Sequence, residues 1–176
     1  MEIKSTDRDC FKLIYEENYV LVMSVIIHIV YNKDIAEDLT QEAFERFYLK
    51  NITFPSEDDA RFWLLRVAKN LALNSVRRNK REIQMIQSIK KDSDSLASSD
   101  GSENILNEES RREVRAAIES LPENLRLVIE LKEYSNLDYK TIGKTLGISE
   151  TNVKVRVYRA RKRLEELLVK EDLDVY

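Results

Sequence analysis

The sequence predicts an all-α fold of two small helical domains joined by a flexible acidic linker, with a helix-turn-helix in the C-terminal domain. Only three Gly and two Pro occur in 176 residues, which favours long helices with few tight turns. Apolar residues recur at helical spacing on both sides of residues 92–109, a stretch with six acids, five serines and no base. We therefore expect domains over residues 1–87 and 111–176, with the linker over residues 88–110.

The first apolar segment predicts a buried helix. Residues 19–31 span 13 positions, too few to cross a bilayer, so no membrane insertion is expected. No export signal opens the chain, and its single cysteine, Cys10, cannot form an intramolecular disulfide. These features favour a cytoplasmic location.

A second helix is predicted after Asp34, which with Glu37 has the form of a capping box. Ile35, Leu39, Ala43 and Phe47 follow at intervals of four and predict its buried face. The opposite face is acidic, which suits a basic protein partner, although a merely solvated face fits the same pattern. That face comprises Glu37, Asp38, Gln41, Glu42 and Glu45.

A third helix is predicted from Ser56, which can cap it with Asp59 three residues later. Ala60, Leu64, Val67 and Leu71 supply its core stripe, and Trp63 is expected in the core. The outer face carries cations and amides, with an aromatic residue at one end. Cations can bind phosphates, and amides and aromatics can bind unpaired bases. A solvated basic helix is the alternative. It comprises Phe62, Arg66, Asn70, Asn74, Arg77 and Arg81.

The second domain has the sequence pattern of a helix-turn-helix. Pro122 starts a helix that continues toward Tyr134, and Asp138 can cap another over residues 139–146. Gly147 can turn with positive φ, and Ser149 can cap the last helix. A helical hairpin without DNA contact is the alternative.

The last helix separates apolar from basic residues. Val153, Val157, Ala160 and Leu164 are expected to face inward. Arg can read guanine and Asn adenine in the major groove, while Lys binds phosphate. The outward residues of these types are Asn152, Lys154, Arg156, Arg159 and Arg163.

Charge is segregated along the chain, although the net charge is −3. Residues 61–81 contain seven Lys or Arg and no acid, and residues 154–163 contain six and no acid. These two basic blocks fit contacts with nucleic acid, whereas the acidic balance predicts weak DNA binding by the free protein.

Enzymatic and metal chemistry are not expected. His28 and Cys10 have no second His or Cys at ligand spacing, so His28 is interpreted as an ordinary helix residue. The chain also has no phosphate-binding glycine loop and no evident nucleophile with a base. We predict no cofactor, no metal and no small-molecule substrate.

Taken in order, these motifs resemble the extracytoplasmic-function sigma factors of the sigma-70 family. Residues 34–44 resemble region 2.2, and residues 62–74 with Arg77 and Arg78 resemble regions 2.3 and 2.4. Residues 121–122, 142–149 and 153–161 resemble region 4. The resemblance implies a transcription initiation factor that directs core RNA polymerase to promoters, and a stand-alone helix-turn-helix regulator is the alternative.

The resemblance also implies roles for single residues. Binding to the β′ clamp helices of core RNA polymerase would fall to Asp38, Gln41, Glu42 and Glu45. Recognition of the melted minus-ten element would fall to Arg66, Asn70, Asn74, Arg77, Arg78 and Arg81. Recognition of the minus-35 element would fall to Ser149, Glu150, Thr151, Asn152, Lys154, Arg156 and Arg159. The β flap of the polymerase, promoter DNA and an anti-sigma factor are the further expected partners.

The chain departs from the family pattern at three places. Thr151-Asn152 stands where Gly-Thr is frequent in the family, and Val155 stands where serine is common. The minus-35 sequence that family members recognise therefore cannot be transferred to this chain. Gly143 replaces the usual alanine and is expected to loosen its helix slightly.

Overall fold

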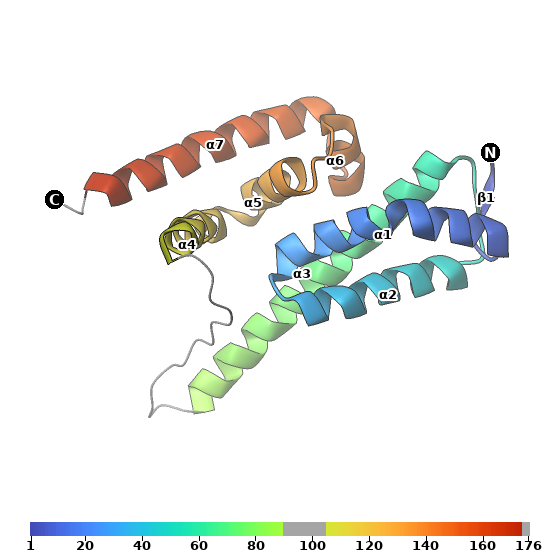
Figure 1. Cartoon of the computed structure of the whole chain (residues 1–176), viewed down its shortest axis with the longest axis horizontal. Coiled ribbons are helices and arrows are strands. Elements are labelled where there is room, and N and C mark those ends of the chain that lie inside the picture. The colour runs from blue at the N-terminus through green and yellow to red at the C-terminus, as the bar shows by residue number, and fades with distance from the viewer. Residues whose placement is uncertain (90–104, 174–176) are drawn as a thin grey trace.

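The computed structural model describes residues 1–89 and 105–173, and it confirms the all-α prediction (Figure 1). The first domain contains α1 (Arg8–Val30), α2 (Lys33–Leu49) and α3 (Glu57–Ile89). The strands β1 (Ile3–Lys4) and β2 (Thr53–Phe54) add a short antiparallel pair in which Ile3 lies opposite Phe54. The second domain contains α4 (Ile105–Ser120), α5 (Glu123–Ile129), the π-helical turn η1 (Glu130–Tyr134), α6 (Tyr139–Leu146) and α7 (Glu150–Leu173).

The predicted linker lies mostly outside the described residues. Helix α3 extends to Ile89 and α4 begins at Ile105, so helices enter both ends of the range 88–110. Only residues 90–104 separate these two helices in the chain.

Helix α1 is longer than the apolar segment that predicted it. Asp7 caps it by accepting hydrogen bonds from the backbone N–H groups of Asp9 and Cys10. The 23-residue helix is long and apolar enough to cross a membrane, so the length argument from 13 residues was wrong. One such helix is weak evidence of a span, because a core helix passes the same test. Here α1 packs on α2 and α3 and buries Val22 and Ile26.

Helix α2 begins earlier than predicted. Asn32, not Asp34, is its N-cap: its backbone is extended, and its side-chain oxygen accepts a 2.9 Å hydrogen bond from the Ile35 N–H. Asp34 lies in the first turn. The buried face also differs, since Ile35 and Leu39 are only half-buried. The fully buried positions are Ala36, Thr40, Ala43, Phe44 and Phe47, a wider face that contacts both α1 and α3.

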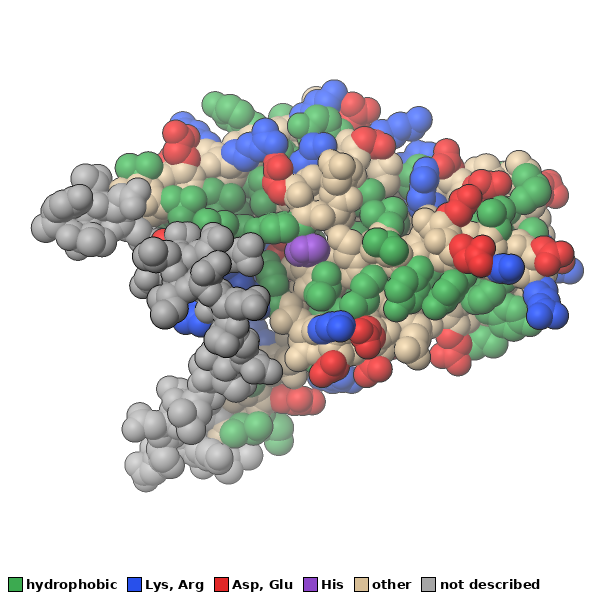
Figure 2. Space-filling model, viewed as in Figure 1, with side chains coloured by type: hydrophobic (Ala, Val, Ile, Leu, Met, Phe, Trp, Pro, Cys, Tyr) green, Lys and Arg blue, Asp and Glu red, His purple; other side chains and the backbone are tan. Residues whose placement is uncertain are grey.

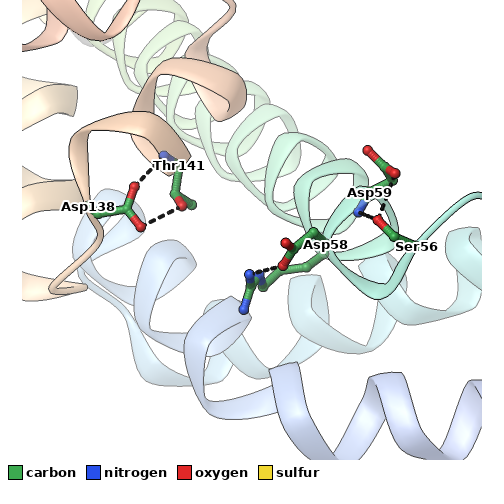
Figure 3. Close-up of polar contacts among 6 residues, drawn as sticks. Ser56, Asp58, Asp59, Asp138 and Thr141 are labelled. Atoms are coloured by element: carbon green, nitrogen blue, oxygen red, sulfur yellow. Dashed lines mark hydrogen bonds and ion pairs between the residues drawn. The ribbon is translucent and has the colours of Figure 1, made fainter. Parts of the chain in front are cut away.

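Helix α3 begins as predicted and then continues without a break for 33 residues. The Ser56 hydroxyl accepts from the Asp59 N–H at 3.2 Å and donates to the Asp59 carboxylate at 2.7 Å (Figure 3). Trp63 is half-buried and packs against Phe47 and Phe54, with ring centroids 5.9 and 6.0 Å away. The core assignment of Trp63 is therefore confirmed.

The helix-turn-helix forms with the predicted caps. Asp138 accepts hydrogen bonds from the Thr141 N–H at 2.7 Å and the Thr141 hydroxyl at 3.1 Å (Figure 3). Gly147 ends α6 with φ +73°, and the Ser149 hydroxyl accepts from the Asn152 N–H. The expectation that Gly143 merely loosens α6 was incomplete. A Cβ at this position would lie 2.7 Å from the Ile148 carbonyl oxygen, so Gly143 permits close packing of the turn.

The two domains contact one another in this structure. Helix α1 packs against η1, and α3 packs against α6 (Figure 1). The sequence left this relative placement open.

Candidate nucleic-acid interface

The predicted minus-ten residues lie along one exposed side of α3. They are spaced by three or four positions, so the helix brings them into a row, with Arg78 beside it. We call Arg66, Asn70, Asn74, Arg77, Arg78 and Arg81 the α3 surface; all six are exposed. A row of this kind presents cations for phosphates and amides for hydrogen bonds to bases.

Lys69 belongs to the same site, although the sequence analysis did not single it out. It is half-buried, and burial together with the nearby charges of Arg66 and Arg77 lowers its pKa. Its place within the basic block of residues 61–81 was the available signal. The lowered pKa means that Lys69 gives up its proton more easily than an isolated lysine.

Phe62 was predicted to lie at one end of the exposed α3 row, but it is not exposed. Its side chain is only 9% exposed, and the Lys144 ammonium lies 3.9 Å from the centre of its ring. Lys144 comes from α6 of the second domain, which the pattern along α3 could not reveal. The aromatic end of the α3 row is therefore covered in this structure.

The predicted minus-35 residues lie at the start of α7. We call Ser149, Glu150, Thr151, Asn152, Lys154, Arg156 and Arg159 the α7 surface; all are exposed except the half-buried Arg156. Val153, Val157 and Ala160 are buried beneath them, as predicted. Blue side chains are prominent along the α7 side of the molecule, interspersed with red ones (Figure 2).

Two contacts organise the α7 surface. The Asn152 amide oxygen accepts a 3.0 Å hydrogen bond from Arg156 Nε, which orients the guanidinium. Lys154 lies 2.8 Å from Glu150, and this hydrogen bond raises the pKa of the Lys154 ammonium. Tyr158 is 70% exposed near these residues, and the sequence analysis did not single it out. Its place within the basic block of residues 154–163 was the available signal.

The predicted polymerase-binding residues lie on α2. Asp38, Gln41 and Glu45 are exposed on the side away from the core. Glu42 differs, because it is half-buried and accepts a 2.6 Å hydrogen bond from Arg46 on the same helix. The acidic character of this face therefore rests chiefly on Asp38 and Glu45.

The structure also brings residues of both predicted DNA surfaces together. Asn70 and Arg77 of α3 line the same cavity of about 540 Å³ as Arg156 of α7. Glu123 and Leu146 of the second domain contribute to its wall. The two predicted DNA surfaces therefore meet at the boundary between the domains.

No group of three or more potential metal ligands occurs among residues 1–89 and 105–173. His28 Nδ1 lies 2.7 Å from the Ser24 carbonyl oxygen, and its ring stacks on Tyr134 with centroids 4.7 Å apart. The interpretation of His28 as a helix residue with one satisfied nitrogen is confirmed.

Comparison with known families identifies the family of this chain. The model of sigma-70 region 2 matches residues 14–82, and the model of sigma-70 region 4 matches residues 111–164. The sigma-E factor of Escherichia coli is 30% identical over 170 residues, covering 93% of this chain and 88% of that protein. This chain belongs to the extracytoplasmic-function sigma factors. The sigma factor is thus a transcription initiation factor of the sigma-70 family.

Other relatives agree with this assignment. The sigma factor SigM of Bacillus subtilis is 30% identical over 150 residues, or 83% of this chain and 87% of SigM. SigE of Mycolicibacterium smegmatis is 34% identical over 141 residues, or 79% of this chain but only 54% of SigE.

Solved structures show the same fold. RpoE of Bartonella quintana, in complex with the anti-sigma factor NepR, superposes with a TM-score of 0.62 at 24% identity. That match covers 90% of this chain and 96% of RpoE. CnrH, in complex with the cytosolic domain of CnrY, gives a TM-score of 0.65 at 20% identity, covering 94% and 92% of the two chains.

Proposed function

We propose that this sigma factor binds core RNA polymerase and directs it to promoters by contacting DNA at two places. The α3 surface receives the unpaired minus-ten element, and the α7 surface enters the major groove of the duplex minus-35 element. The observation that carries the proposal is the presence of two distinct Arg- and Asn-containing surfaces, one within each matched sigma region.

The chemistry of the α3 surface suits unpaired DNA. Asn70 and Asn74 offer amides that can hydrogen-bond the exposed edges of unpaired bases. Arg66 and Arg77 flank these amides and can bind phosphates on either side. The α3 surface would thus hold a strand that is already melted.

The chemistry of the α7 surface suits duplex DNA. Ser149 caps the helix, so its first turn presents backbone N–H groups and polar side chains together. Arg156, oriented by Asn152, can donate two hydrogen bonds to guanine. Lys154 would contact phosphate.

Helix α2 would supply the contact with polymerase. Asp38, Gln41 and Glu45 are exposed on one acidic face, which complements a basic partner such as the β′ clamp helices. The second domain would contact the β flap. The sigma factor would act in the cytoplasm, where polymerase is found.

An anti-sigma factor is a further proposed partner. Both structural neighbours were solved with a protein partner, NepR for RpoE and the cytosolic domain of CnrY for CnrH. We propose that a comparable inhibitor controls this sigma factor. A stand-alone regulator is less well supported, because it would not need the region 2 match over residues 14–82.

Transcription in vitro tests the proposed function. Core polymerase with this sigma factor should initiate selectively from a subset of a promoter library. Arg156→Ala should reduce initiation by about tenfold or more at promoters that carry the selected minus-35 guanine, in line with the loss of one bidentate contact. Arg163→Ala is the matched control, because Arg163 lies two turns further along α7 and pairs with Glu166 at 3.0 Å. Equal initiation with and without the sigma factor would reject the proposal.

A further inference from the structure

We propose that Val155 gives this sigma factor a preference for thymine in the minus-35 element, by packing against the C5-methyl group of that base in the major groove. This inference rests on the proposed function, because it concerns which base the α7 surface selects. It is carried by the position of Val155 on α7, by its exposure and by the charges around it.

Val155 lies at the centre of the outward side of α7. Successive residues of an α-helix are rotated by about 100°, so residues two positions apart point to nearly opposite sides. Val153 and Val157, two positions before and after Val155, are 0% and 2% exposed, whereas Val155 is 40% exposed. The side of α7 that faces away from the core therefore carries an apolar side chain at its centre.

Exposed side chains continue the line through Val155 in both directions. Thr151 lies four positions earlier and Tyr158 three positions later, so both share its side of the helix. Tyr158 is 70% exposed. The Thr151 methyl group, the Val155 side chain and the Tyr158 ring form an apolar strip, which we call the central strip of α7. Water solvates such a strip poorly, so a partner that covers it gains free energy.

Polar pairs border Val155 on both flanks. On one flank, Asn152 accepts the 3.0 Å hydrogen bond from Arg156, which is half-buried. On the other flank, Lys154 lies 2.8 Å from Glu150. Both pairs join residues four positions apart, so each runs along the helix beside Val155. The hydrogen-bonding groups thus border the central strip and do not cross it.

The surrounding charge favours DNA as the partner of the central strip. Residues 151–164 contain six Lys or Arg and no acid. Phosphates border the major groove of DNA, and thymine presents a methyl group within that groove. An apolar side chain bordered by cations therefore matches a thymine methyl group bordered by phosphates.

The place of Val155 along α7 fits a contact with a base. Ser149 caps the helix, so Val155 lies in its second turn, within the N-terminal part that meets base edges in a helix-turn-helix. Tyr158 lies nearly one turn further on, where its hydroxyl would donate to a phosphate. Val155 and not Tyr158 therefore sets the base preference.

Removal of the methyl group from the DNA tests the contact directly. Holoenzyme is formed from core polymerase and the full chain, and a promoter is selected from a library. Each thymine of its minus-35 element, on either strand, is then replaced in turn by uracil, which lacks only the C5-methyl group. At one position at least, uracil should weaken promoter binding by wild-type holoenzyme about fourfold in a competition mobility-shift assay, the factor expected for one buried methyl group.

Val155→Ser tests the protein side of the same contact. Holoenzyme with this variant should bind the thymine promoter about fourfold more weakly than wild type. It should also bind the uracil promoter as well as the thymine promoter, because the methyl group has lost its partner. Val169→Ser is the matched control, because Val169 is 53% exposed on the same helix but lies outside the α7 surface. This control should keep the full effect of uracil.

The possible results separate this inference from the function on which it rests. Equal binding of thymine and uracil promoters by wild-type holoenzyme at every position would overturn the thymine contact, and so would a selected element without thymine on either strand. An equal effect of uracil in wild type and Val155→Ser would overturn the role of Val155. Holoenzyme that selects no promoter from the library would reject the proposed function itself, and this inference with it.

Discussion

At the scale of single residues, Glu130 combines a charged group with an almost fully buried position. Burial raises the pKa of its carboxyl to about 7, and the charge of Glu119 acts in the same direction. The hydrogen bond from Tyr31 and the charge of Arg126 act to lower this pKa but do not overcome burial. Near neutral pH, the carboxyl therefore exists in both protonation states.

This raised pKa predicts a pH dependence of stability. The unfolded chain has the ordinary carboxyl pKa of 4.5, so the folded protein binds the proton more tightly between pH 4.5 and about 7. The free energy of unfolding should therefore fall as pH rises through this window, by an amount on the order of 3 kcal/mol or less. Urea unfolding of wild type and Glu130→Gln between pH 5 and 8 measures it. The glutamine variant should lack this component, and identical pH profiles would show that Glu130 is not responsible.

Gly147 gives a second prediction at the residue scale. Its φ of +73° strains any residue with a Cβ, while no atom lies within 4 Å of the space that a Cβ would fill. Gly147→Ala should therefore destabilise the protein by about 1 kcal/mol through backbone strain alone. Gly147→Asn is the matched control and should cost less, because asparagine tolerates the left-handed region. Thermal unfolding measures both, and an unchanged alanine variant would argue against the positive φ.

Residues whose partners lie close in sequence were predictable, and those whose partners lie far away were not. Ser56, Asp138 and Ser149 cap helices as predicted, because each bonds a residue three positions ahead. Phe62 was misplaced because its neighbour Lys144 lies 82 positions away, on another domain. The capping prediction was wrong at Asp34, because Asn32, two residues earlier, is the N-cap of α2.

At the scale of helices, periodicity predicted which elements form but less well where they end. The apolar run of residues 19–31 covered only part of α1, whose first turns are more polar and are set by the Asp7 cap. Helix α3 extends to Ile89, beyond the last residue of its core stripe at Leu71. The π-helical turn η1 was not predicted, because the sequence pattern of one wider turn resembles that of an α-helix.

The acidic face of α2 yields a prediction at the same scale. Asp38→Lys should weaken binding to core polymerase about tenfold, because a lysine would repel the basic partner that this face is proposed to meet. Glu17→Lys is the matched control, since Glu17 is exposed on α1, outside the α2 face. Pull-down of core polymerase measures the difference, and thermal unfolding verifies the fold of each variant. Equal loss in both variants would indicate an effect of net charge and not of α2.

At the scale of the whole molecule, the sequence predicted two domains but not their contact. The interface uses positions scattered over both domains, such as Tyr31 with Glu130 and Arg66 with Lys144. None of these pairs follows from helical periodicity, because each connects separate helices across the predicted linker. The segregation of charge along the chain could be predicted from the sequence. The contact between the positive α3 surface and the second domain could not.

The net charge of the chain and two contacts of α3 predict weak DNA binding by the free protein. The chain carries a net charge of −3, which repels DNA at long range, and Arg66 and Arg77 of α3 already bind groups of the second domain. Polymerase would offset this repulsion by tethering both domains and so raising their effective concentration at the promoter. Mobility-shift assays at about 0.15 M salt should therefore detect a promoter complex with holoenzyme but not with sigma factor alone at the same concentration. Sigma factor alone should gain measurable affinity at low salt, where Lys and Arg contacts with phosphate strengthen. Tight, promoter-specific binding by the isolated chain at physiological salt would contradict this explanation.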